Sequence, residues 1–279
     1  MPTTWRCGRF LFDFTKRKRP VVMGILNATP DSFSDGGQFR TPKDAIAQAE
    51  LMIANGVDLI DIGGESTRPG AEPVALQEEL DRVLPVIEAL KDCGVPLSID
   101  TYKAEAMRQA LHAGVDCVND IWALRQDGAL DVVLESNDCG IVLMHMQRDP
   151  LTMQFNPEYR DVVAEVILFL KERTELLRSK GINQNRLAID PGFGFGKSLE
   201  HNLSMLSHFK DFSTLGYPVL AGISRKSMIG KLTGKDANER IAPSIAAAIM
   251  AADRGAKIIR VHDVPETVDA LKLWEAIEA

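Results

Sequence analysis

The sequence predicts an α/β protein that forms a single (β/α)8 TIM barrel. Three observations support this prediction. Eight short apolar segments alternate with helical patterns along the 279 residues. These segments are apolar throughout, as strands are when helices cover both faces of a parallel sheet. No linker or change in composition divides the chain, and one barrel typically needs about 250 residues.

The expected strands are short apolar runs, each following a helix or a turn. They are Val21–Leu26, Val57–Ile62, Pro96–Ile99, Cys117–Asn119, Ile141–Met144, Leu187–Ile189, Val219–Gly222 and Lys257–Val261. A doubly wound open sheet shows the same alternation and is the structural alternative. Residues 1–20 precede the first strand, and we expect them to form a short hairpin-like extension across the barrel's bottom. Residues 1–279 then form one domain.

The expected helices have recognisable ends. Thr41 is an N-cap residue with Pro42 in the first turn, and Gly56 ends that helix after Asn55. A glycine also follows most of the later helices, where it can adopt the left-handed conformation of a C-cap. These later helices are Leu76–Cys93, Lys103–His112, Asp161–Lys180, Asn238–Arg254 and Val264–Ile277.

Composition and charge exclude several classes of partner. Lys and Arg number 32 against 39 Asp and Glu, and this net charge of −7 argues against nucleic acid or an anionic membrane as a partner. No apolar run approaches the roughly 18 residues that suggest a membrane span. The four cysteines lack the spacing of a zinc site and are typical of a reducing compartment. We therefore expect a cytoplasmic protein.

Polar residues follow every expected strand, at the end where a barrel carries its active site. Asp100, Asn119 and Asp190 combine acceptors and donors that suit a flat, nitrogen-rich heterocycle. Cations that follow the second, seventh and eighth strands are able to converge on an anion. They are Arg68, Arg225, Lys226, Arg260 and His262.

Two nucleotide-binding motifs each fail at one position. Residues 192–198 end like a P-loop, but the leading glycine of that motif would fall on Pro191. The dinucleotide-binding pattern fails because its third glycine would fall on Lys197. The sequence therefore favours neither ATP nor NAD.

Five segments of the sequence, taken together and in their order along the chain, have the character of family motifs. They are Met23–Gly37, Asp61–Ala71, Asp190–Lys197, Ser224–Gly230 and Arg260–His262. Together they resemble the dihydropteroate synthases. The resemblance implies a bacterial-type transferase of folate biosynthesis. It would condense 4-aminobenzoate with (7,8-dihydropterin-6-yl)methyl diphosphate to give 7,8-dihydropteroate and pyrophosphate, with Mg²⁺ as cofactor and a homodimer as the usual assembly.

The residues present fit that chemistry. An aromatic amine is unprotonated near neutral pH, so the reaction needs no strong general base. A diphosphate leaves readily once its charge is neutralised. If the carbon–oxygen bond breaks first, a cationic methylene conjugated to the pterin forms, and carboxylates can stabilise it.

The resemblance also assigns roles to matching positions. Asn27 would help to bind Mg²⁺. Asp100, Asn119 and Asp190 would recognise the edge of the pterin, and Asp100 would also stabilise developing positive charge. Lys226 would contact the pterin carbonyl and a ring nitrogen.

The remaining roles concern the diphosphate and the second substrate. Arg260 would cover the pterin face and join His262 at the diphosphate. Asp100, Lys226 and Arg260 form the expected catalytic set. The other expected binding residues are Thr67 and Arg68 near the diphosphate, Phe33, Pro69 and Ser227 around the aminobenzoate, and Met144 in the pterin slot.

Two other functions remain open. A pterin-binding domain of a corrinoid methyltransferase shares this barrel and slot, and an inactive homologue could serve only as a binding subunit. Phe33 and the Thr67–Pro69 segment resemble sulfonamide-sensitive members. Tyr102, Ala104 and Trp122 depart from the usual family pattern, which leaves the fine shape of the pocket open.

Overall fold

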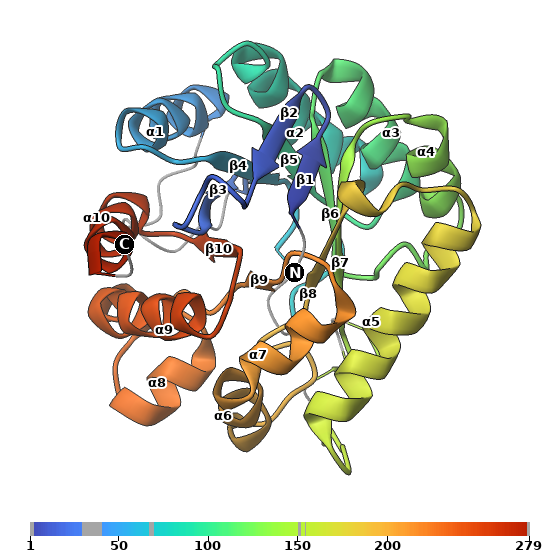
Figure 1. The fold of residues 1–279 in the computed structure, drawn as a ribbon. Coiled ribbons are helices and arrows are strands. Elements are labelled where there is room, and N and C mark those ends of the chain that lie inside the picture. The colour runs from blue at the N-terminus through green and yellow to red at the C-terminus, as the bar shows by residue number, and fades with distance from the viewer. Residues whose placement is uncertain (1–2, 30–40, 67–69, 150–151, 154, 278–279) are drawn as a thin grey trace.

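A computed structural model confirms the barrel (Figure 1) and describes residues 3–29, 41–66, 70–149, 152–153 and 155–277. Eight parallel strands form one sheet in the order β8-β7-β6-β5-β4-β3-β10-β9. They are β3 (Val21–Asn27), β4 (Leu59–Gly63), β5 (Leu97–Asp100), β6 (Cys117–Asp120), β7 (Gly140–Met144), β8 (Leu187–Asp190), β9 (Leu220–Ala221) and β10 (Ile258–Val261). A bridge between Ile189 and Val219 joins the two edges, so the open-sheet alternative is wrong.

Helices surround the strands, as Figure 1 shows. They are α1 (Pro42–Ala54), α2 (Leu76–Leu90), α3 (Ala104–Ala113), α4 (Ala129–Glu135), α5 (Val162–Ser179), α6 (Leu199–Ser207), α7 (Phe209–Phe212), α8 (Ser227–Thr233), α9 (Ile241–Asp253) and α10 (Val264–Ile277). Short 3-10 turns lie at Gln184–Arg186, Ser213–Leu215 and Ala237–Glu239. Among these described helices, none combines the length and the apolar character that crossing a membrane requires.

Most of the predicted helices begin and end in the structure close to the residues that the sequence predicts. Thr41 and Asp44 form a capping box at the start of α1, and Gly56 has a φ of 84° just after that helix. The segment expected as one helix over Asn238–Arg254 instead begins as a 3-10 turn and becomes α9 only after Arg240. The sequence does not predict α4, α6, α7 and α8, of which α6 is the longest at 9 residues.

A hairpin of β1 (Thr4–Cys7) and β2 (Phe10–Asp13) covers the bottom of the barrel, as predicted. Trp5 of this hairpin is fully buried, and its indole N–H donates to the Arg186 carbonyl at 3.2 Å. Trp5 and Cys7 pack on apolar residues at or near the strand starts, which we call the barrel floor. The floor consists of Val21, Met23, Leu59, Cys117, Val142, Ala188, Leu220 and Ile258.

Above the floor, the side chains that face into the barrel change from apolar to polar along a strand. Residues two apart share a face of a strand. On β4 the step from Leu59 to Asp61 replaces an apolar floor residue with a carboxylate, and on β6 the step from Cys117 to Asn119 brings in an amide. The barrel therefore has a closed apolar lower end and a polar upper end.

Candidate active site

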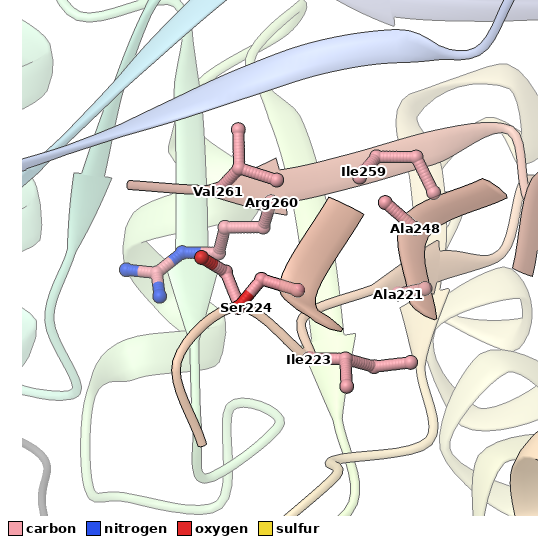
Figure 2. A pocket seen from close by; sticks show the side chains of 8 residues that line it. Ala221, Ile223, Ser224, Ala248, Ile259, Arg260 and Val261 are labelled. Carbon is pink, nitrogen blue, oxygen red and sulfur yellow. The ribbon is translucent and has the colours of Figure 1, made fainter. Parts of the chain in front are cut away.

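The side chain of Arg260 lies in the upper end of the barrel, where it bridges two carboxylates. Its Nε is 2.6 Å from Asp61 Oδ2, and its Nη2 is 2.6 Å from Asp100 Oδ2. Figure 2 shows the guanidinium pointing away from Ala248 and Ile259, which belong to the core between sheet and helices. Burial disfavours the charged form, but the two carboxylates outweigh it and raise the pKa of Arg260 above its usual value.

Asp61 also holds a second predicted site residue. It is fully buried, and Asn119 Nδ2 donates to its Oδ2 at 3.0 Å. Asp61 is not among the predicted site residues, because those residues follow strands and Asp61 lies inside β4. A carboxylate within an apolar strand is the signal that could have identified it.

Asp100 and Asn119 are register neighbours at the ends of β5 and β6. Burial raises the pKa of Asp100 to about 7; the charge of Arg260 lowers it, while Asp61 and Glu79 raise it further. Asp100 Oδ1 is buried and has no hydrogen-bond partner among the described residues. This carboxyl therefore titrates near neutral pH and has an acceptor oxygen available for a ligand N–H.

Asp190, at the end of β8, and Lys226, just after β9, lie near each other where these two strands meet and close the barrel. Asp190 accepts the Gly192 backbone N–H at 2.7 Å, and the Lys226 ammonium donates to the Phe193 carbonyl. Burial lowers the pKa of Lys226 to about 8, and the charge of Asp190 partly opposes this shift. Gly192 has a φ of 73°, and a Cβ there would lie 2.0 Å from the His145 carbonyl oxygen, so the turn needs glycine.

One member of the expected cation cluster, Arg225, is paired with a carboxylate, as Arg260 is. Arg225 forms a two-point ion pair with the buried Asp263, through Nη2 and through Nε at 3.0 Å. This pair fixes Arg225 to the residue that follows His262, and so holds the loop after β9 in place. His262 Nδ1 is 3.1 Å from Ser224 Oγ, and Ser227 is exposed at the start of α8.

Asn27 ends β3 beside Gly63 of β4. A Cβ on Gly63 would lie 3.7 Å from Asp100 Cβ and 3.9 Å from Asn27 Oδ1, so both side chains border the same small space. Among the described residues, no group of three or more His, Cys, Asp or Glu could hold a metal ion.

An apolar wall flanks the polar groups. Met144, the register partner of Asp190, belongs to it. The wall consists of Ile121, Met144, Met146 and Met153, with Tyr102, Trp122 and Phe195 packed against them. The ring of Phe195 lies 4.6 Å from Lys226 Nζ, within the range of a cation–π contact. The departures at Tyr102 and Trp122 thus lie in the wall rather than among the polar groups.

Two polar clusters, each built around a lysine that is not among the predicted site residues, support the site. Lys197 Nζ is 2.9 Å from both His145 Nδ1 and the Phe195 carbonyl oxygen, and so connects β7 with the loop after β8. Burial, together with the nearby lysine charge, lowers the pKa of His145 to about 2. The second cluster lies at the base of the loop after β4, where Lys103 Nζ is 2.6 Å from Glu65, Glu79 and the Val74 carbonyl.

The structure thus brings together Asp100, Asn119, Met144, Asp190, Lys226 and Arg260, with His262 and Ser227 on the same end of the barrel. Phe33, Thr67, Arg68 and Pro69 lie outside the described residues.

Comparison with known proteins agrees with this arrangement. Residues 23–262 match the family described as pterin binding enzymes. A dihydropteroate synthase of Neisseria meningitidis serogroup C is 49% identical, over 98% of this chain and 97% of the relative. The Burkholderia cenocepacia enzyme solved with 7,8-dihydropteroate is 51% identical, with a TM-score of 0.90 over 99% of this chain and 97% of that chain.

The Yersinia pestis dihydropteroate synthase, solved with a sulfonamide drug, is 46% identical, with a TM-score of 0.93 over 99% of each chain. These matches extend over the whole barrel and involve relatives of nearly the same length. The chain therefore belongs to the dihydropteroate synthase family of pterin-binding enzymes.

Proposed function

We propose that this chain condenses 4-aminobenzoate with (7,8-dihydropterin-6-yl)methyl diphosphate in folate biosynthesis. The amine nitrogen forms a bond to the methylene carbon, the carbon–oxygen bond to the diphosphate breaks, and the nitrogen releases one proton. The products are 7,8-dihydropteroate and pyrophosphate. The observation that carries this proposal is the bridge from Arg260 to Asp61 and Asp100, with Lys226 and Asp190 nearby.

The pterin edge would be read by Asp100, Asn119 and Asp190. Asp100 and Asn119 are register neighbours and Asp190 ends β8, which supports this role, because a flat ring with several N–H groups needs acceptors along one edge. Lys226 would supply the donor for the ring carbonyl and a ring nitrogen. Met144 would contact the apolar part of the ring from the wall. A carboxylate at Asp100 would also stabilise positive charge that develops on the methylene as the diphosphate leaves.

The diphosphate would be held by Arg260 and His262, with Thr67 and Arg68 contributing from the loop after β4. The donors of Arg260 and His262 come from β10 and its end, so they approach the leaving group from one side. Charge-assisted hydrogen bonds to phosphate oxygens strengthen as negative charge develops on them.

A magnesium ion would be held at Asn27. The Asn27 amide oxygen is a hard donor, and Mg²⁺ commonly keeps several waters and takes few protein ligands beside substrate phosphates. The absence of a larger acidic cluster among the described residues agrees with such a site. When bound, the ion would neutralise charge on the diphosphate.

The aminobenzoate would bind next to Ser227, with Phe33 and Pro69 on the other sides. The sulfonamide bound to the Yersinia pestis relative supports a drug-binding pocket of this kind. We expect sulfamethoxazole to inhibit turnover in competition with 4-aminobenzoate.

A coupled assay of pyrophosphate release tests the function. Purified protein is supplied with the pterin diphosphate and Mg²⁺, with and without 4-aminobenzoate. Release that depends on 4-aminobenzoate supports the synthase. Binding of the pterin without such turnover would instead indicate an inactive binding subunit or the pterin domain of a methyltransferase.

The matched variants are Lys226→Ala and Lys257→Ala. Both lysines are half-buried, but Lys257 lies at the opposite end of the barrel, just before β10. We expect Lys226→Ala to lose turnover with an unchanged circular-dichroism spectrum, and Lys257→Ala to retain turnover. An unfolded Lys226→Ala would show that this lysine is structural.

We also propose a cytoplasmic homodimer that binds neither nucleic acid nor membranes. The four cysteines are free, which agrees with a reducing compartment. The alanines over Ala246–Ala252 mostly pack inward, so they support within-barrel packing rather than assembly. Apolar side chains do remain exposed on the adjacent α9 and α10, namely Met250, Leu273 and Ile277. Light scattering of the wild type and of Met250→Glu tests whether this surface joins two chains.

A further inference from the structure

Asp61 lies one pleat deeper in the barrel than the predicted pterin-binding residues. We propose that Asp61 is a positioning residue: it fixes which end of the Asn119 amide faces the heterocycle, and it holds Arg260 in place. This inference rests on the proposed function, since it concerns how the same slot selects its substrate.

The first step concerns the two ends of the Asn119 amide. An ionised carboxylate only accepts hydrogen bonds, so the group that Asn119 directs at Asp61 Oδ2, 3.0 Å away, must be its NH₂. The amide oxygen of Asn119 then points elsewhere and is available as an acceptor. Asn119 therefore selects a ligand that offers an N–H, as the edge of a pterin does.

The second step concerns Arg260. Its Nε and Nη2 each have a carboxylate oxygen at 2.6 Å, one from Asp61 and one from Asp100. Two hydrogen bonds from different nitrogens fix the plane of a guanidinium as well as its position. Asp100 alone would leave that plane free to rotate about one contact.

The third step is that Asp61 can act only through these neighbours. Its side chain has no exposed surface, whereas the side chain of Arg260 is 18% exposed and can meet a ligand. One oxygen, Oδ2, receives both Arg260 and Asn119, so a single atom couples two binding residues. Removing it would misplace both together.

Calorimetric titration with (7,8-dihydropterin-6-yl)methyl diphosphate tests this coupling. We expect Asp61→Asn to weaken binding roughly tenfold or more, and Asn119→Ala to weaken it much less in that background than in the wild type. The control is Asp116→Asn, because Asp116 is also a buried carboxylate paired with an arginine, Arg9 at 3.2 Å. It should lower the melting temperature without changing affinity. Additive effects of the two site variants would overturn the proposal.

A second variant covers the case in which Asp61→Asn does not fold. Asn119→Asp places two carboxyl groups in contact, and a proton shared between them recreates the donor that faces Asp61. Its pterin affinity relative to that of the wild type at the same pH should therefore recover as the pH falls, whereas a relative weakening that is independent of pH would contradict the proposal. A residue that is merely structural would give no such pH profile.

The two proposals fail in different ways. Wild-type protein that releases no pyrophosphate would contradict the synthase function. The link between Asp61 and Asn119 is also visible in the side-chain NH₂ signal of Asn119 by NMR, which Asp61→Asn should shift and Asp116→Asn should not. An Asn119 signal unaffected by Asp61→Asn would contradict the positioning role, whatever the turnover.

Discussion

Burial sets the protonation of two residues that would both contact the pterin, Asp100 and Lys226. The pKa of Asp100 is raised to about 7, and that of Lys226 is lowered to about 8. Below the first value the carboxylate gains a proton and can no longer stabilise positive charge. Above the second value the ammonium loses its proton and donates less strongly.

We therefore expect kcat/KM to follow a narrow bell between these two pKa values. Lys226→Arg should move the basic limb to higher pH, because a guanidinium stays charged throughout this range. Pyrophosphate release measured from about pH 6 to about pH 9 checks this expectation. A basic limb that stays in place in Lys226→Arg would show that another group controls it.

Asn27 gives a prediction about the metal. Asn27→Ala should raise the Mg²⁺ concentration needed for half-maximal turnover, by about tenfold, because an oxygen ligand is lost. Titration of Mg²⁺ at saturating substrates measures the effect. Asn55→Ala, which removes a similar amide at the end of α1, is the control and should leave the requirement unchanged.

Individual elements are held in register by buried polar pairs as well as by apolar packing. The pair of His145 and Lys197 connects the end of β7 with the loop after β8. The pKa of His145 is about 2 in the fold against an ordinary value of 6.5. Between these two pKa values the unfolded chain binds a proton at His145 that the folded chain does not bind, so the folded state loses stability as the pH falls below the higher value.

The free energy of unfolding should therefore fall on acidification through this residue, by about 1.4 kcal/mol for each pH unit below 6.5. His145→Asn cannot titrate, so its stability deficit relative to the wild type should shrink as the pH drops. Urea unfolding of both proteins at two pH values measures the difference. A deficit that stays constant with pH would contradict a neutral buried histidine.

The elements also differ in how far the sequence predicts them. The sequence predicts long capped helices, such as α1 after Thr41, and apolar strands, because local chemistry determines both. The short helices are not, because a segment such as Ser227–Thr233 gains its stability from packing rather than from its own propensity.

The same distinction applies to the site. Polar residues at strand ends mark Asp100, Asn119 and Asp190, since a barrel brings those ends together. Which charged group each side chain pairs with, however, depends on the tertiary structure. Arg225 carries the same charge as Arg260 and lies in a family motif, yet it pairs with Asp263, whereas Arg260 pairs with Asp61 and Asp100. The sequence does not indicate a role for Asp61, because its contacts join residues on other strands of the barrel that are distant in the chain.

At the scale of the whole molecule, the N-terminal hairpin closes the barrel from below. Trp5→Ala should lower the free energy of unfolding by about 3 to 5 kcal/mol, because it opens a cavity between the hairpin and the barrel floor. The Michaelis constants should change little, since the floor lies below the polar groups. Leu11→Ala is the matched control, as Leu11 on β2 is 53% exposed. Equal melting temperatures for the two variants would contradict the role of the hairpin.

The barrel closes at β9, which has only 2 residues and meets β8 through the bridge between Ile189 and Val219. This seam separates Asp190, at the end of β8, from Lys226, just beyond β9. Its few backbone hydrogen bonds should break before those of the longer ladders, so amides near Val219 should exchange with deuterium soonest among the barrel strands. A pterin that bridges Asp190 and Lys226 would then hold the two sides of the seam together and slow the exchange of these amides.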